Sequence, residues 1–91
     1  MKYIIFEVTI GEELKKEEPV IFPNMFVHED VAKRICHMLE MEHNFTSVPV
    51  SDGEFNPISC ECSGKSETLN LKSRPQDSDI VKLCDYGMNF K

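Results

Sequence analysis

Apolar and polar residues alternate over residues 4–10, the first patterned stretch of the chain. Every second residue here is apolar, and Glu7 and Thr9 are among the residues between them. A period of two is typical of a strand with one buried face. The pattern therefore predicts a strand over residues 4–10, which Gly11 ends.

A helical period follows further along, where Val31, Ile35 and Leu39 recur at every fourth position. Four more residues widen this line into an apolar stripe: His28, Ala32, Cys36 and Met38. Such a stripe is typical of a helix that packs one face on a core. We expect this helix to organise the fold, with the strands packed on it.

Local signals mark both ends of this helix. The two residues after His28 are acidic, and the partial positive charge at a helix N-terminus favours acids there. His43 can supply a cation at the other end, and the asparagine after it tolerates the left-handed conformation that often ends a helix. The sequence predicts a start near His28 and an end between Met41 and Asn44.

The other apolar stretches are short and bounded by turn residues. Residues 19–23 form a strand bracketed by prolines, which favour a sheet edge because proline cannot donate to a ladder. Residues 46–51 are extended, and Asp52-Gly53 after them is a turn signal. Alternation predicts a strand over residues 55–63 and a last strand over residues 66–71.

A second helix is predicted near the end of the chain. Residues 73–76, Ser-Arg-Pro-Gln, have the form of a capping box with proline in the first turn. Asp77 and Asp79 suit the positive end of the helix dipole. We expect an inward stripe and a terminating glycine made by Ile80, Leu83, Cys84 and Gly87.

These elements make one α+β domain over residues 1–91. The expected architecture is a small, mostly antiparallel sheet of four to five strands with two helices packed on one face. The 91 residues suit a single domain with one modest core. A hydrophobic content of 41% with 29% charged residues is typical of a folded globular chain.

The chain is acidic, with 16 Asp and Glu against 10 Lys and Arg and a formal charge of -6. This balance opposes nucleic-acid binding, which needs a basic face. An acidic mimic of nucleic acid is an alternative, but the densest run, residues 12–18, is cut by two lysines. We expect that run to be a solvated loop.

No stretch is long and apolar enough for a membrane span, and the apolar run at the start is too short for a signal peptide. The sequence therefore predicts a protein of a reducing cytosol, without a membrane partner. Its four cysteines are expected to stay thiols and to act as small core residues.

The alternative chemistry rests on these cysteines. Cys60 and Cys62 could join Cys84 or His28 as zinc ligands, but the single residue between the first two is a poor spacing for a structural zinc site. Either of the pair could also meet a histidine as a catalytic dyad, given an orienting group and a cleft. We predict core packing, no metal, no cofactor and no catalytic residue.

A likeness to known proteins lies in residues 19–23, 27–32, 49–55 and 63–69, with Ser73-Arg74-Pro75 after them. These segments resemble small uncharacterised proteins encoded by tailed bacteriophages. It covers most of the chain and carries no known chemical role. The resemblance implies a phage accessory or virion-associated protein made in the bacterial host cytoplasm.

The expected function is therefore non-enzymatic protein-protein interaction. The partner would be a host protein or the phage particle, and self-association through a sheet edge is a variant. Proline-marked edge strands and an acidic surface provide two ordinary modes of association, strand addition and electrostatic complementarity. A Cys/His-dependent or zinc-binding enzyme is the alternative class.

Overall fold

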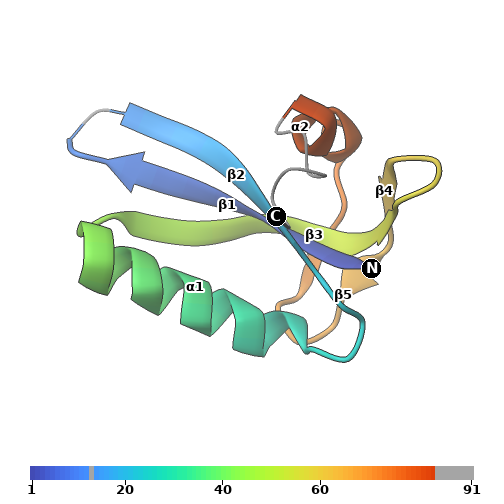
Figure 1. The fold of residues 1–91 in the computed structure, drawn as a ribbon, viewed down its shortest axis with the longest axis horizontal. Coiled ribbons are helices and arrows are strands. Elements are labelled where there is room, and N and C mark those ends of the chain that lie inside the picture. The colour runs from blue at the N-terminus through green and yellow to red at the C-terminus, as the bar shows by residue number, and fades with distance from the viewer. Residues whose placement is uncertain (13, 84–91) are drawn as a thin grey trace.

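The computed structural model describes residues 1–12 and 14–83. The fold belongs to the α+β class that the sequence predicts (Figure 1). In chain order the elements are β1 (Lys2–Ile10), β2 (Leu14–Phe22), α1 (His28–His43), β3 (Thr46–Asn56), β4 (Glu61–Ser63), β5 (Lys65–Ser66), β6 (Leu71–Lys72) and α2 (Asp77–Leu83).

Four strands form the main sheet in the order β2-β1-β3-β4, and every pairing in it is antiparallel. The first strand of the chain therefore lies inside the sheet, between β2 and β3. Strands β5 and β6 form a separate antiparallel pair beside it. The prediction of a mostly antiparallel sheet of four to five strands is confirmed.

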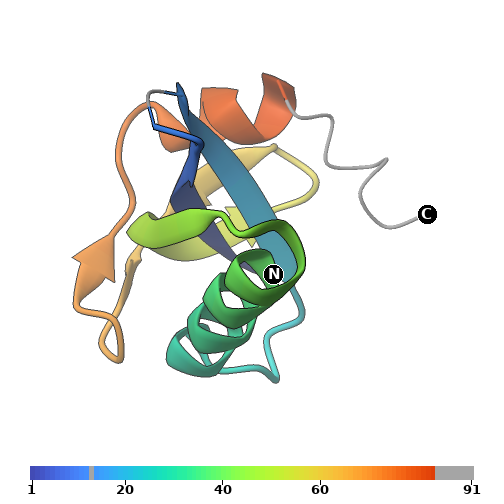
Figure 2. The same cartoon turned by 90° about the vertical axis from the view of Figure 1, so that its left-hand side faces the viewer.

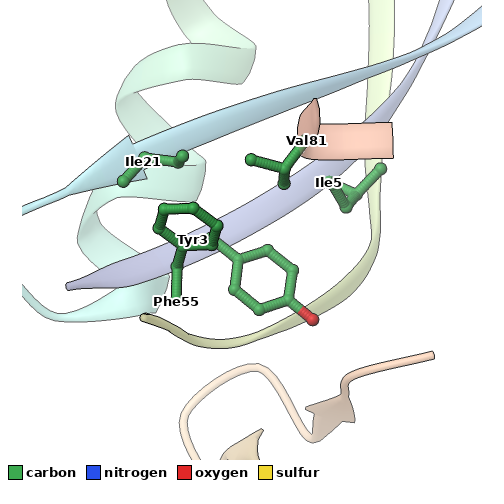
Figure 3. Close-up of a cluster of buried hydrophobic side chains, with 5 residues drawn as sticks. All are labelled: Tyr3, Ile5, Ile21, Phe55 and Val81. Carbon is green, nitrogen blue, oxygen red and sulfur yellow. The ribbon is translucent and has the colours of Figure 1, made fainter. Parts of the chain in front are cut away.

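The two helices lie on opposite faces of this sheet (Figures 1 and 2), so the prediction that both pack on one face is wrong. Tyr3 and Ile5 of β1 belong to the cluster that includes Val81 of α2 (Figure 3). Ile4 and Phe6 belong to the cluster that includes Ala32 of α1. Since consecutive residues of a strand point to opposite faces, this four-residue apolar run needs cover on both sides.

Helix α1 has the predicted limits, from His28 to His43. Asn44 adopts the left-handed conformation at φ 57°, and its N–H donates to the Glu40 carbonyl oxygen at 3.0 Å. His28 and Ala32 are buried against the sheet. Glu29 pairs with Lys33 at 2.9 Å on the outer face. The local end signals predicted this element correctly.

Two segments predicted as irregular are strand. The charged stretch after residue 13 is the first half of β2, not a solvated loop. Pairing with β1 outweighs its low strand propensity, and Lys15 and Lys16 bind Glu7 and Glu18 on the strand surface. Asp52-Gly53 lies inside β3 instead of making a turn. Tertiary pairing decides the conformation at both places.

The two predicted strands after β3 are interrupted by turns. Residues 57–60 form a turn before the short β4, and Cys60 has a left-handed φ of 59°. Residues 67–70 form a turn between β5 and β6. Alternation alone did not mark these breaks, because turn residues here continue the polar and apolar pattern.

Helix α2 begins at Asp77, after the predicted capping box rather than within it. Its fully buried apolar residue is Val81, while Leu83 is 86% exposed. The predicted stripe was therefore rotated, with only Ile80 packed against the core as expected. Cys84 and Gly87 lie outside the described residues.

Candidate functional site

The most densely bonded polar group of the described chain is the Asp77 carboxylate, which is fully buried. Tyr3 Oη donates to Asp77 Oδ2 at 2.6 Å, and Ser51 Oγ donates to Asp77 Oδ1 at 3.0 Å. Burial is the largest cause, and the hydrogen bond to Asp77 the second, of a pKa of Tyr3 that is raised well above its usual range. The tyrosine therefore stays protonated at neutral pH and acts as a donor.

Arg74 completes the cluster from the turn before α2. Its backbone N–H donates to Asp77 Oδ2 and its Nε donates to Asp77 Oδ1, each at 3.0 Å. A terminal guanidinium nitrogen of the same residue donates to Glu17 Oε1 on β2 at 2.6 Å. Both oxygens of Asp77 thus accept hydrogen bonds, which ties α2 to the sheet and leaves neither oxygen of Asp77 free for general-base chemistry.

A second buried acid, Asp52, has a different environment on the opposite face. It is fully buried, and neither carboxylate oxygen has a partner within hydrogen-bonding geometry among the described residues. Burial raises the pKa of Asp52. The nearby His28 and Ser66 lower this pKa by less, so that it stays above its ordinary value. His28 itself is held by its Nε2, which donates to the Gly53 carbonyl oxygen at 2.9 Å.

Replacing Asp52 by asparagine should stabilise the protein at neutral pH by about 1 kcal/mol, because a buried charge without full hydrogen bonding is removed. A raised folded-state pKa means that the contribution of Asp52 to stability is complete below its unfolded pKa and is lost as pH rises through the folded value. Urea melts at several pH values above 4 should show a flatter stability profile for Asp52→Asn than for the wild type. The exposed Asp79→Asn is the control, and a loss of stability in Asp52→Asn alone would contradict this account.

The structure separates the residues considered for zinc or for a Cys/His dyad. Cys60 and Cys62 pack against the cluster on the α2 face, and burial raises the pKa of the Cys62 thiol to about 11. His28 lies on the α1 face, and the other two histidines are exposed on the same helix. The sheet therefore stands between the thiols of Cys60 and Cys62 and the three imidazoles of α1.

Cys84, the third cysteine of the zinc hypothesis, lies outside the described residues. Within residues 1–12 and 14–83, no group of three or more His, Cys, Asp or Glu side chains could hold a metal ion. Two acids of the charged stretch lie on different faces of the sheet, Glu17 on the α2 face and Glu18 on the α1 face.

The loop before α1 exposes three consecutive apolar residues, and we call Met25-Phe26-Val27 the apolar loop. Their side chains are 82%, 49% and 42% exposed. The loop has a defined shape, because the Phe26 N–H donates to the Pro23 carbonyl oxygen at 3.2 Å and Lys2 Nζ donates to the Phe26 carbonyl oxygen at 2.8 Å. It joins β2 to α1 at the lower right of Figure 1.

An apolar groove of about 330 Å³ lies on the α1 face. The residues that line it come from α1, β1, β2 and the segment after α1, and those on β2 are Lys16, Glu18, Pro19 and Val20. Sequence reasoning missed the groove and the apolar loop, although three apolar residues in a row shortly before a helix start were visible.

Comparison with family models, with curated proteins and with solved structures gives no match to this chain. Neither helix of the described part is long and apolar enough to cross a membrane. The candidate functional surfaces are therefore defined by their geometry alone.

Proposed function

We propose that this protein is a non-enzymatic binding module that inserts its apolar loop into an apolar pocket on a larger protein. The observation that carries the proposal is the run of three exposed apolar side chains, residues 25–27. Runs of this kind are unfavourable on a surface unless they serve binding. Methionine and aromatic side chains are also enriched at protein interfaces.

The backbone around the apolar loop supports the same proposal. The Val31 N–H donates to the Val27 carbonyl oxygen at 3.1 Å, so the last residue of the loop is hydrogen-bonded to the first turn of α1. The lysine bond from β1 holds the loop from the other side. Because the loop is fixed before binding, docking would cost little conformational entropy.

The proposed partner rests on the resemblance to tailed-phage proteins. We propose that the protein acts in the bacterial host cytoplasm, where it docks either on a host protein or on the phage particle. In the second case it would be found in purified virions. The proposed mode is insertion of the apolar loop, which needs no free cysteine, metal or cofactor.

Met25→Ser and Phe26→Ser should each weaken partner binding about tenfold or more, because each removes an apolar anchor from the interface. The test is capture by the tagged protein from lysates of infected and uninfected cells, followed by titration of the captured partner after purification. Analysis of virion proteins in parallel distinguishes a particle component from a host modulator.

Ile58→Ser is the matched control, since Ile58 is an apolar side chain that is 95% exposed in a different turn. It should leave capture and affinity unchanged. If the two loop variants capture and bind the same partner as strongly as the control, the apolar loop is not the docking surface.

A further inference from the structure

Among residues 1–12 and 14–83, no strand pairs with the outer side of β2, which is the first strand in the sheet order and forms its edge. The backbone hydrogen bonds at the β3 side of β1 show which residues of β2 direct their N–H and C=O groups away from β1. The Phe55 N–H donates to the Met1 carbonyl oxygen at 2.6 Å, and the Met1 amine donates to the Phe55 carbonyl oxygen at 3.1 Å. Odd-numbered residues of β1 therefore direct their backbone groups to β3, and even-numbered ones to β2.

The same alternation continues into β2. Even-numbered residues of β2 face β1 with their backbone groups, because each is opposite an even-numbered residue of β1. The odd-numbered residues direct theirs to the open edge: Lys15, Glu17, Pro19 and Ile21. Pro19 has no N–H, and it stands where that group is not needed for the β1 pairing.

The side chains of even-numbered and odd-numbered residues of β2 lie on opposite faces of the sheet. Lys16, Glu18 and Val20 line the groove on the α1 face. Leu14 is also even-numbered, so it lies on the same face, and it is 59% exposed. Along the α1 face, β2 thus presents an apolar residue, a base, an acid and an apolar residue in turn. When two copies of this order run in opposite directions, each charge meets its opposite and each apolar residue meets another.

We propose that β2 pairs antiparallel with β2 of a second copy, about a two-fold axis that passes at Glu17. In this register Lys16 lies opposite Glu18 of the second copy, and Leu14 lies opposite Val20 of the second copy. Each pair occurs twice because the contact is symmetric. Opposite charges and apolar side chains placed directly across from one another both stabilise antiparallel strands.

Neighbouring registers are less favourable. A shift of the axis by one residue toward the start of β2 would place Lys16 opposite Lys16 of the second copy, and the reverse shift would place Glu18 opposite Glu18. An axis between residues would set outward backbone groups against inward ones. Lysines at an edge usually prevent pairing, but in the proposed register Lys16 has an acid opposite it.

On the α2 face of the same contact, nearby cations reduce the repulsion between two acids. The two copies of Glu17 lie opposite each other at the axis, and each is already bound by Arg74 of its own chain at 2.6 Å. Lys15 lies at the next position on this face and adds a further positive charge diagonally across from Glu17 of the second copy. Each Glu17 carboxylate at the axis therefore has a cation of its own chain beside it, which reduces the repulsion between the two acids.

Leu14 and Pro19 complete the contact. Leu14 of the second copy would lie beside Val20 at the edge of the apolar groove and cover apolar surface that is exposed in the single chain. Pro19 removes one backbone donor on each side of the axis, which makes the contact weaker than a full strand pairing. The symmetric contact occupies the β2 edge of both copies, so assembly through this edge stops at a dimer.

Sedimentation equilibrium on the untagged chain should show a concentration-dependent dimer. Lys16→Glu and Glu18→Lys should each raise the dimer dissociation constant about tenfold or more, because each replaces attraction by repulsion at two pairs. An equimolar mixture of the two variants should dimerise again, since both charge pairs across the mixed interface once more join an acid to a base. Recovery in the mixture also shows that both variants are folded.

Lys33→Glu is the control, because it makes the same charge change at an exposed position on α1. It should leave the dimer intact. A wild-type chain that is monomeric up to high micromolar concentration, a control variant that is as monomeric as Lys16→Glu, or a mixture that stays monomeric would each refute the dimer. These outcomes do not depend on the apolar loop, which lies beyond the paired part of β2.

Discussion

Gly53→Ala should lower the free energy of unfolding by about 3 kcal/mol or more, the largest loss we expect from adding one methyl group. A Cβ atom at Gly53 would lie 2.2 Å from the Ser63 carbonyl oxygen, a backbone atom. That oxygen is fixed by the pairing of Ser63 with Glu54 between β3 and β4. Gly53 also has a φ of 154°, which side chains disfavour.

Gly11→Ala is the matched control for this substitution. Gly11 has a left-handed φ of 71°, but a Cβ atom there would meet nothing within 4 Å. It should cost about 1 kcal/mol through backbone strain alone. Urea unfolding of both variants measures the difference, and equal losses would mean that β4 moves freely away from β3.

Asp77→Ala should cost about 3 to 5 kcal/mol, because it leaves the Tyr3 hydroxyl, the Ser51 hydroxyl and part of the Arg74 guanidinium without their acceptor. The loss should be accompanied by detachment of α2 from the sheet, visible as faster amide hydrogen exchange in that helix. Asp79→Ala removes an exposed acid from the same helix and should cost less than about 0.5 kcal/mol.

Asp77→Asn separates charge from shape in this cluster. The amide keeps one acceptor for Tyr3 or Ser51 but places an N–H₂ group toward donors. Its stability should fall between the wild type and Asp77→Ala. If Asp77→Ala unfolds at the same urea concentration as Asp79→Ala, the cluster does not hold α2 in place.

The limits of α1 were predictable because they depend on neighbouring residues. An acidic first turn and an asparagine that tolerates the left-handed conformation act within one turn of the helix end. The α+β class followed from the order of periodic segments along the chain. Both predictions rest on short-range physics, which is present in the sequence itself.

The predictions are wrong where contacts between residues far apart in the sequence determine the local structure. The charged first half of β2 is a strand because β1 pairs with it, and Asp52-Gly53 is extended because β1 lies beside it. The helices occupy opposite faces because Tyr3 and Ile5 are buried as deeply as the residues between and beside them. Alternation over residues 4–10 emphasised one apolar set and hid the other.

The candidate surfaces were harder to predict for the same reason. Asp77 was expected at the start of a helix, where an acid suits the dipole, yet donors from β1 and β3 converge on it and bury it. The edge position of β2 was anticipated from its prolines, and the structure adds the parity of its side chains. The apolar loop needed the fold to show that its three side chains stay outside the core.

Arg74 links the β2 edge of the sheet to α2. It bonds the buried carboxylate of α2 with one part of its guanidinium and Glu17 of β2 with another. Anything that binds along β2 and favours this Glu17 geometry must therefore also favour the docked position of α2. Thermodynamic reciprocity makes the converse hold, so a ligand that loosens α2 would weaken association at an edge it never touches.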